Sequence, residues 1–336
     1  MSMDSLFAKL AEIRANPSGG TFILADARDA DMSWGIPSFG KARSGHGFRS
    51  APAFLEEIRA VVRQGFVDVL LASVSTMEKL AHEERLFDGT HVTPAVRIND
   101  ATDIWCQRGA RYRELPSAPF ATAYIQEAQF GSLIAPREGA PVVNLGLYSM
   151  TFNNDLEADL RSLRAFREFR ADAEKCGFHY FLEVFPPNSP KAGLTSEQVP
   201  AFVNDQIVRA LAGVPSGGRP LFLKIPYFGP GPLEELVAYD PSVVVGILGG
   251  SSGTTYDAFK LLADGRKHGA RVALFGRRIK DSEHPLEFIR MLRLIADGEI
   301  EPQEAVKSYH SEIGKHGVKA KRTLEEDLLL TPTESS

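Results

Sequence analysis

The chain has 336 residues, of which 43% are hydrophobic and 24% are charged, and its formal net charge is -5. This composition is typical of a globular protein with a sizeable core, and it excludes the strongly basic balance of a nucleic-acid-binding protein. No window reaches the roughly eighteen uninterrupted apolar residues of a membrane span, so we expect no membrane association.

The first twenty residues contain Asp4 and Glu12 within a short amphipathic pattern, and they lack the continuous apolar core of a signal peptide. The two cysteines, Cys106 and Cys176, are too few for a disulfide framework and too far apart for a metal knuckle. We therefore expect both cysteines to be free thiols in a cytoplasmic protein. We also expect a helical extension over 1–20.

Short apolar runs rich in β-branched residues recur along the chain, and amphipathic segments with helical spacing follow most of them. The apolar runs span 21–26, 67–73, 92–98, 141–149, 179–185, 220–227, 242–249 and 270–276. The helical patterns cover 53–65, 77–87, 155–177, 197–213, 232–239, 256–269 and 285–298. This alternation predicts a closed (β/α)8 TIM barrel, because an open doubly wound sheet usually stops at about five or six strands.

Two regions depart from the alternation. Residues 99–140 have no clean period, and we expect only a short helix there, around 121–131. Residues 301–317 predict one additional helix after the barrel. The expected organisation is therefore an N-terminal helical extension over 1–20, a single barrel domain over 21–300, and a C-terminal helix and tail over 301–336.

The active site of such a barrel lies at the C-terminal ends of the strands, so polar residues that follow or interrupt the apolar runs are candidates. These candidates are Asp26, Arg28, Arg97, Asn99, Asp100, Asn144, Tyr148, Glu183 and Lys224. We expect catalytic roles for Lys224, Glu183 and Asp26. The expected substrate contacts are Arg28, Arg97, Asn144 and Tyr148.

Lys224 lies between apolar neighbours in LFLKIPY. Desolvation disfavours a buried ammonium, and a neutral lysine amine can form an iminium with a ketone or an aldehyde. Glu183, on the preceding predicted strand, could pair with this amine and transfer protons. Asp26 offers a second carboxylate for proton transfer or hydroxyl binding. The alternative is a structural lysine that pairs with a carboxylate or extends to solvent.

Two glycine-containing turns follow the seventh and eighth runs, where TIM barrels often bind phosphate. Gly249, Gly250 and Ser251 precede a helix whose N-terminal N–H groups favour an anion. In the next unit, Gly276 permits close backbone approach and Arg277 can grip a phosphate with two hydrogen bonds. The eight histidines show no ligand spacing, and no nucleotide-binding motif is present, so we expect neither a metal nor a cofactor.

Five segments resemble the class I, Schiff-base aldolases of the deoxyribose-phosphate and tagatose-bisphosphate aldolase type: LADARDAD, FLEVF, LFLKIPY, GILGGSSG and ALFGRR. The resemblance implies that Lys224 is the iminium lysine and that Glu183 is an acid/base or its support. It also implies a phosphate clamp made of Gly249, Gly250, Ser251, Gly276 and Arg277. The chain departs from this family at Asn144, in VVNLGLY, where a second lysine is often found; Glu183, Tyr148 or Tyr227 would then move the protons.

We therefore expect an aldolase-like lyase that cleaves or forms a carbon–carbon bond in a phosphorylated ketose or a related sugar acid. The resemblance further suggests a homo-oligomer. Two alternatives stay open: a transaldolase or isomerase acting on a phospho- or sulfo-sugar, and a non-catalytic barrel that binds a sugar phosphate.

Overall fold

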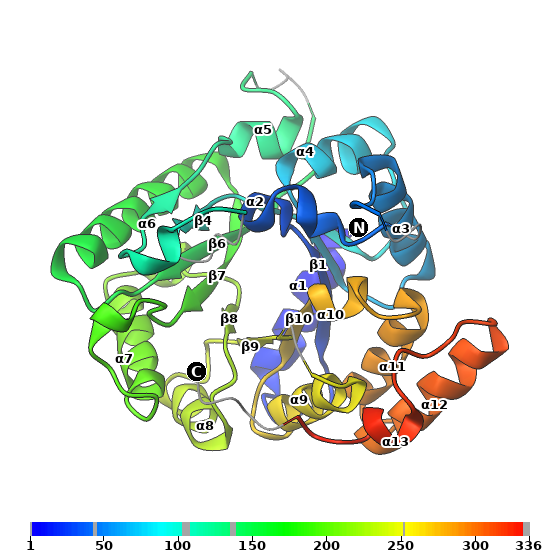
Figure 1. Cartoon of the computed structure of the whole chain (residues 1–336). Helices are drawn as coiled ribbons and strands as arrows, with labels where there is room; N and C mark the ends of the chain where they lie inside the picture. The colour runs from blue at the N-terminus through cyan, green and yellow to red at the C-terminus, as the bar shows by residue number, and fades with distance from the viewer. Residues whose placement is uncertain (1, 43–45, 103–107, 135–138, 251–252, 332–336) are drawn as a thin grey trace.

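The computed structural model describes residues 2–42, 46–102, 108–134, 139–250 and 253–331. Eight parallel strands close into a barrel in the order β1-β10-β9-β8-β7-β6-β3-β2 (Figure 1). The strands are β1 (Ile23–Arg28), β2 (Val69–Ala72), β3 (Thr93–Arg97), β6 (Leu145–Thr151), β7 (His179–Phe185), β8 (Leu223–Ile225), β9 (Val245–Leu248) and β10 (Val272–Phe275). Each overlaps one of the predicted apolar runs, and the predicted TIM barrel is confirmed.

Helices surround the barrel as an outer ring (Figure 1). They are α3 (Ala51–Gln64), α4 (Val74–Met77) with the π-helical turn Glu78–Glu83, α5 (Ile125–Phe130), α6 (Leu156–Cys176), α7 (Val199–Ala212), α8 (Pro230–Tyr239), α9 (Thr255–Lys267) and α11 (Pro285–Asp297). The ends of α6 show why they form where they do. The side chain of Asp155 accepts a hydrogen bond from the N–H of Ala158, and Gly177 ends the helix at a φ of 59°.

Helix α12 (Pro302–Lys315) packs outside α9 and α11. The remaining elements are short: α2 (Asp31–Trp34), α10 (Arg277–Lys280), α13 (Leu324–Asp327), the 3-10 turns Ile36–Phe39, Tyr112–Glu114, Pro190–Ala192 and Ser216–Gly218, and the antiparallel pair β4 (Asp100–Ala101) and β5 (Pro119–Phe120). Helix α12 is the predicted additional helix. In the irregular region the expected short helix is α5, whereas the two-residue strands β4 and β5 were not expected. The division at 20 and 300 stays a prediction.

The apolar core has an inner and an outer layer because successive side chains of a strand point to opposite faces. Residues such as Ile23, Leu147 and Phe181 fill the barrel itself, and their neighbours on each strand pack against the helices. Helix α1 (Ser2–Ala15) belongs to the inner layer: its Leu6 and Leu10 pack among the inward residues, and the helix lies behind the barrel in Figure 1. The alternation therefore decides which strand residues can reach the barrel mouth.

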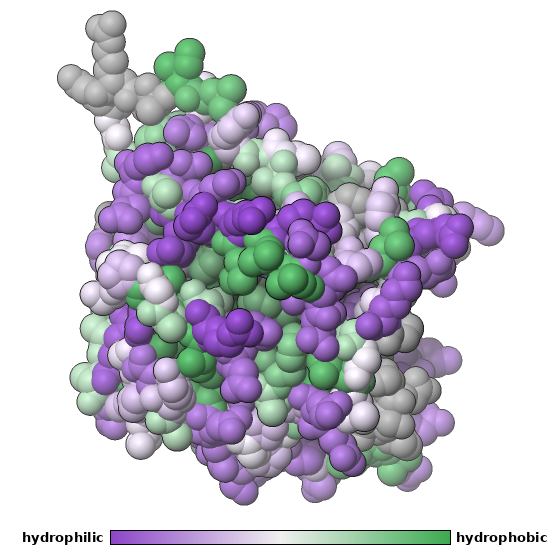
Figure 2. All heavy atoms as spheres, turned by 90° about the vertical axis from the view of Figure 1, so that its left-hand side faces the viewer, coloured by the Kyte–Doolittle hydropathy of each residue, from purple (hydrophilic) through white to green (hydrophobic). Residues whose placement is uncertain are grey.

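The side that carries α6 mixes hydrophilic and hydrophobic surface, with hydrophobic atoms gathered near the middle of the face (Figure 2). The segment after α5 projects from the molecule and leaves Leu133 and Ile134 exposed at 57% and 82%. Within the described part of the chain, no helix combines the length and the apolar character needed to cross a membrane. The expected homo-oligomer stays a prediction.

Candidate active site

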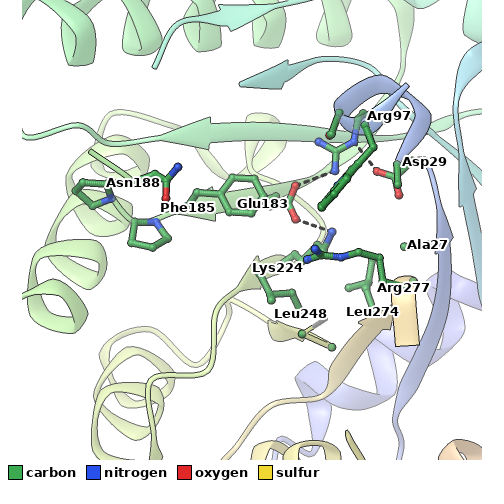
Figure 3. A pocket seen from close by; sticks show the side chains of 18 residues that line it. Ala27, Asp29, Arg97, Glu183, Phe185, Asn188, Lys224, Leu248, Leu274 and Arg277 are labelled. Carbon is green, nitrogen blue, oxygen red and sulfur yellow. Dashed lines mark hydrogen bonds and ion pairs between the residues drawn. The ribbon is translucent and has the colours of Figure 1, made fainter. Parts of the chain in front are cut away.

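A cavity of about 320 Å³ opens at the C-terminal ends of the barrel strands. Its lining includes Lys224 and Glu183 at the centre, Asp29 and Arg97 on one side, and Gly276 and Arg277 at the β10 turn (Figure 3). These residues come from different strands and the loops that follow them. The cavity thus occupies the place where TIM barrels carry their active sites.

Lys224 and Glu183 form a buried ion pair at the centre of this cavity. They are register partners on the adjacent strands β8 and β7, so both side chains point to the same side of the sheet. The Nζ of Lys224 lies 2.5 Å from Oε1 of Glu183, and the two residues are 6% and 1% exposed. A proton can pass directly between the amine and the carboxylate across this distance.

Arg97, at the end of β3, connects Glu183 to two further carboxylates. Its Nη2 lies 3.2 Å from Glu183 Oε2, its Nε donates to Asp29 Oδ2 at 2.5 Å, and its Nη1 lies 3.1 Å from Asp100 Oδ1. Burial alone would lower the pKa of Arg97, but the carboxylates of Asp100, Asp29 and Glu183 raise it. Arg97 therefore stays charged and orients the acidic groups around the lysine.

Ser149, on β6, completes the contacts of Glu183. Its Oγ donates to Glu183 Oε2 at 2.7 Å and accepts from Arg97 Nη1 at 2.8 Å. Lys224 holds one carboxylate oxygen, while Arg97 and Ser149 hold the other. The orientation of the Glu183 carboxylate is therefore fixed on both sides.

Asp29 and Asp100 bind the same arginine, yet their pKa values move in opposite directions. Burial opposes ionisation of Asp29, but Arg97 and Lys224 outweigh it, so its pKa is lowered. Burial raises the pKa of Asp100 to about 6, despite Arg97 and a hydrogen bond of 2.5 Å from Ser33 Oγ. The ionised form of Asp29, which lines the cavity, is therefore favoured, whereas burial favours the protonated form of Asp100, which does not line it.

The predicted anion-binding turns line the same cavity. A Cβ on Gly276 would lie 2.4 Å from the carbonyl oxygen of Ala27, and one on Gly249 would lie 2.2 Å from the ring of Phe275. Gly250 has a φ of +64°, which disfavours any residue with a Cβ. Both turns therefore require glycine for backbone geometry and close packing, and they bring Gly249, Gly250 and Gly276 to the cavity wall.

Arg277 also lines this end of the cavity, with its guanidinium 5.6 Å from the ring centroid of Trp34. The indole supports the side chain from α2, and cation–π contact of this kind keeps an arginine extended across an aromatic face. Ser251, the remaining predicted member of the clamp, lies outside the described residues.

Asp26 and Arg28 do not reach the cavity. They lie on the outward face of β1, where Arg28 Nε donates to Asp26 Oδ2 at 2.8 Å and Arg28 Nη1 lies 3.4 Å from Glu57 of α3. Burial raises the pKa of Asp26 even though Arg28 opposes this shift. The carboxylate that β1 and its loop bring to the cavity is Asp29, so the expected roles of Asp26 and Arg28 at the site have no geometric support.

Asn144 and Tyr148 also lie elsewhere. Asn144 precedes β6 at the opposite end of the barrel, where it accepts from Gln129 at 2.8 Å and donates to the carbonyl of Gly177 at 3.0 Å. Tyr148 points outward to α6 and stacks on Phe169 with centroids 4.3 Å apart. Neither lines the cavity, and Tyr227 does not line it either.

Asp29, Ser149, Ser33 and Trp34 are the site residues that the sequence did not single out. Asp29 and Ser149 share the inward parity of Ala25 and Leu147, which could have revealed them. The helix-facing positions of barrel strands are just as apolar, however, so the pattern does not separate the two faces. Ser33 and Trp34 lie on α2, a four-residue helix with no periodic pattern of its own.

No family model matches the chain, and no curated protein matches it. Among solved structures, an archaeal fructose 1,6-bisphosphate aldolase aligns with a TM-score of 0.62 and 18% identity over 87% of this chain and 98% of its own. A fructose-bisphosphate aldolase from Slackia heliotrinireducens aligns with a TM-score of 0.63 and 17% identity over 91% of each chain.

A further archaeal fructose-1,6-bisphosphate aldolase, whose catalytic lysine carries the carbinolamine intermediate of its substrate, aligns with a TM-score of 0.61 and 20% identity over 87% of this chain and 99% of its own. These proteins are of the type that the sequence motifs resemble. At these identities the likeness is one of fold: the chain has the TIM barrel that Schiff-base aldolases also have.

Proposed function

We propose that the protein is a class I aldolase-like lyase in which Lys224 forms a Schiff base with the carbonyl of a phosphorylated ketose or a related sugar acid. The observation that carries the proposal is the Lys224–Glu183 pair, with 2.5 Å between Nζ and Oε1, in one cavity with the two glycine turns and Arg277.

Schiff-base formation requires proton transfers that Glu183 is placed to perform. When the amine passes its proton to Glu183, the free electron pair on Nζ attacks the carbonyl carbon. The carbonyl oxygen then takes the proton held by Glu183, and the nitrogen gives its surplus proton back to Glu183, which leaves a neutral carbinolamine. Protonation of the hydroxyl then lets it leave as water, and the iminium remains on Lys224. Arg97 and Ser149 keep the carboxylate in place through these steps.

Cleavage of the carbon–carbon bond uses the iminium as an electron sink. A base removes the proton from the hydroxyl on the β-carbon, the bond between the α- and β-carbons breaks, and its electron pair moves into the iminium to form an enamine. The β-carbon leaves as an aldehyde. Asp29, an ionised carboxylate in the cavity wall, can accept a hydrogen bond from such a hydroxyl.

The phosphate would lie against the part of the cavity wall that follows β9 and β10. Backbone groups of the Gly249–Gly250 and Gly276 turns can approach it closely, and Arg277 supplies charge and paired N–H donors. Binding energy at this end would place the carbonyl carbon of the substrate against Nζ.

Borohydride reduction tests the proposal. Incubation with dihydroxyacetone phosphate and sodium borohydride should add the reduced adduct to Lys224, as located by peptide mass spectrometry, and Lys224→Ala should abolish this labelling. Lys280→Gln is the matched control, because Lys280 is also buried, at 8% exposure, but does not line this cavity.

Labelling that survives Lys224→Ala would overturn the proposal. Phosphate binding without any trapping at Lys224 would instead favour the non-catalytic sugar-phosphate-binding barrel.

A further inference from the structure

The C-terminal strap, Thr323–Thr331, lies against the start of α9, the helix that follows the first anion-binding turn. Figure 1 shows α13, which is part of the strap, next to α9. The central contact is Asp327, which is 3% exposed. Its Oδ1 accepts from the backbone N–H of Thr255 at 2.7 Å, and its Oδ2 lies 2.9 Å from His310 Nε2 of α12.

Two further residues of the strap bind the same helix end. The carbonyl of Leu329 accepts from Thr254 Oγ1 at 2.7 Å. The N–H and hydroxyl of Thr331 donate to the Asp257 carboxylate at 3.0 and 2.6 Å. The strap thus contacts the N-cap, the first and the third residue of α9 through polar groups.

The segment after the Gly276 turn also contacts this end of α9, through the backbone carbonyl groups. Arg278, next to Arg277, donates to the carbonyl of Gly253 at 2.8 Å and also to the carbonyl of Thr254. The chain that leaves the Gly249–Gly250 turn is therefore held by Arg278 through its carbonyls and by Asp327 through an N–H. Both attachments act within a few residues of the cavity wall.

The same contacts occupy the first N–H groups of α9. The N–H of Thr254 donates to Asp257 at 2.6 Å, and that of Thr255 donates to Asp327. These amides are not available to a substrate phosphate. The phosphate would rely on the turns and on Arg277, so its affinity depends on how firmly the turn is positioned.

We infer that the strap is part of the anion site and that Asp327 is a positioning residue for the Gly249–Gly250 turn. The inference rests on the proposed function, since it presupposes that this turn binds the substrate phosphate. The strap is expected to act on phosphate affinity and not on the reaction at Lys224, because its contacts are made to Thr254, Thr255 and Asp257 and not to Lys224 or its partner Glu183.

The experiment uses the full chain and inorganic phosphate as the probe, with Kd measured by titration calorimetry. Asp327→Ala should raise the Kd about tenfold. Loss of a helix-capping group has a free-energy cost of this size, and the cost would appear in phosphate binding if the capping contact positions the turn. Asp327→Asn keeps an acceptor for Thr255 and should raise it about threefold. Glu325→Ala, which removes an exposed carboxylate from the same short helix, should leave the Kd at the wild-type value.

A second readout separates positioning from general loosening. Trapping of unphosphorylated dihydroxyacetone on Lys224 by borohydride should proceed at the wild-type rate in Asp327→Ala. An unchanged phosphate Kd, or an equal loss of phosphate binding and trapping, would overturn the inference. Should Asp327→Ala not fold, Asp327→Asn and Thr331→Val decide the matter, and wild-type Kd values in both would overturn it.

The proposed function fails in a different way. If wild-type protein is not labelled at Lys224, the Schiff base is wrong whatever the strap does. If wild-type protein does not bind phosphate, the anion site is wrong and the role of the strap goes with it.

Discussion

Both carboxylate oxygens of Glu183 are engaged, one by Lys224 and the other by Arg97 and Ser149. A buried carboxylate with this many partners is held in one orientation, which suits a group that exchanges protons with a neighbouring amine. Glu183 and Lys224 also compensate each other's charge, so neither buried charge lacks a partner when no substrate is bound.

The proposed function predicts that Glu183 and Asp26, two buried carboxylates of the barrel, differ in their effects on kcat and on stability. In Glu183→Gln the amide keeps the shape but cannot shuttle protons, so kcat should fall by about 10²–10⁴-fold. Asp26 lies on the outward face of β1, away from the cavity. Asp26→Asn should therefore leave kcat at the wild-type value, and it should lower the free energy of unfolding by about 3 kcal/mol because Arg28 loses its buried partner. Steady-state kinetics and urea unfolding of both variants check this, and an equal loss of kcat in the two would contradict it.

Asp100 should make stability depend on pH between about 4 and 6. Its folded pKa of about 6 exceeds the ordinary value of 3.8, so the folded state binds this proton more tightly than the unfolded chain. That contribution is present below pH 4 and is lost as pH rises through 6. Asp100→Asn lacks this loss, so the difference in unfolding free energy between variant and wild type should shift in favour of the variant by ~2 kcal/mol from pH 4 to 7.

Urea unfolding at several pH values measures this shift. Other buried acids, such as Asp26, are present in both proteins and cancel in the difference. A difference that does not vary with pH would show that Asp100 titrates normally in the folded state.

At the scale of single residues, the sequence predicted which residue types form the site better than it predicted which face of a strand each side chain occupies. Lys224, Glu183 and Arg97 are unusual because charge interrupts apolar strands, and all three line the cavity. Asp26 carries the same signal and Tyr148 also places a polar group in an apolar strand, yet both point outward. Which face a residue takes is set by strand register in the closed sheet, and apolar neighbours on both faces hide that register.

The turn from β10 to α10 illustrates what the elements contribute. A side chain at Gly276 would meet the Ala27 carbonyl of β1, a backbone atom that cannot move without shifting its strand. The turn is therefore fixed against the neighbouring strand, and this places Arg277 at the cavity.

Gly276→Ala should lower the free energy of unfolding by about 1–3 kcal/mol through overpacking and should raise the KM for a phosphorylated substrate. Gly314→Ala is the matched control. A Cβ at Gly314 would meet nothing within 4 Å, and the residue lies within α12, so alanine should stabilise the protein by about 0.5–1 kcal/mol. Thermal unfolding and initial rates test both, and an undisturbed KM in Gly276→Ala would argue against the turn as an anion site.

Elements that carry a long periodic pattern of apolar residues were predictable from the sequence, whereas elements of two to four residues without such a pattern were not. All eight barrel strands and the longer helices follow runs that hydrophobic patterning marks clearly. The pair β4 and β5 contains two residues per strand, and α2 contains four. Such elements depend on tertiary contacts such as the Ser33–Asp100 hydrogen bond, which no local pattern encodes.

At the scale of the whole molecule, the two ends of the barrel differ in the residues that they carry. The C-terminal end carries the cavity with its charged groups. The inner core includes the buried Leu6, Leu10 and Ile13 of α1. Polar contacts fix this helix, including Lys9 Nζ at 2.7 Å from Asp68 Oδ1 and Arg14 Nη2 at 3.0 Å from the carbonyl of Leu221, which precedes β8. The contacts that hold α1 and the residues of the candidate site thus lie in separate regions of the barrel.

Leu10→Ala should therefore reduce stability without altering the site. Leu10 is 0% exposed, and truncation of such a side chain costs about 2–5 kcal/mol. Leu156→Ala is the control, since Leu156 is 74% exposed and its loss should change the unfolding free energy by less than about 0.5 kcal/mol. Urea unfolding should show this contrast, while borohydride trapping at Lys224 at 25 °C proceeds at the same rate in both variants. A slower trapping rate in folded Leu10→Ala would mean that α1 is coupled to the cavity through the inner core, and the two ends would then not be independent.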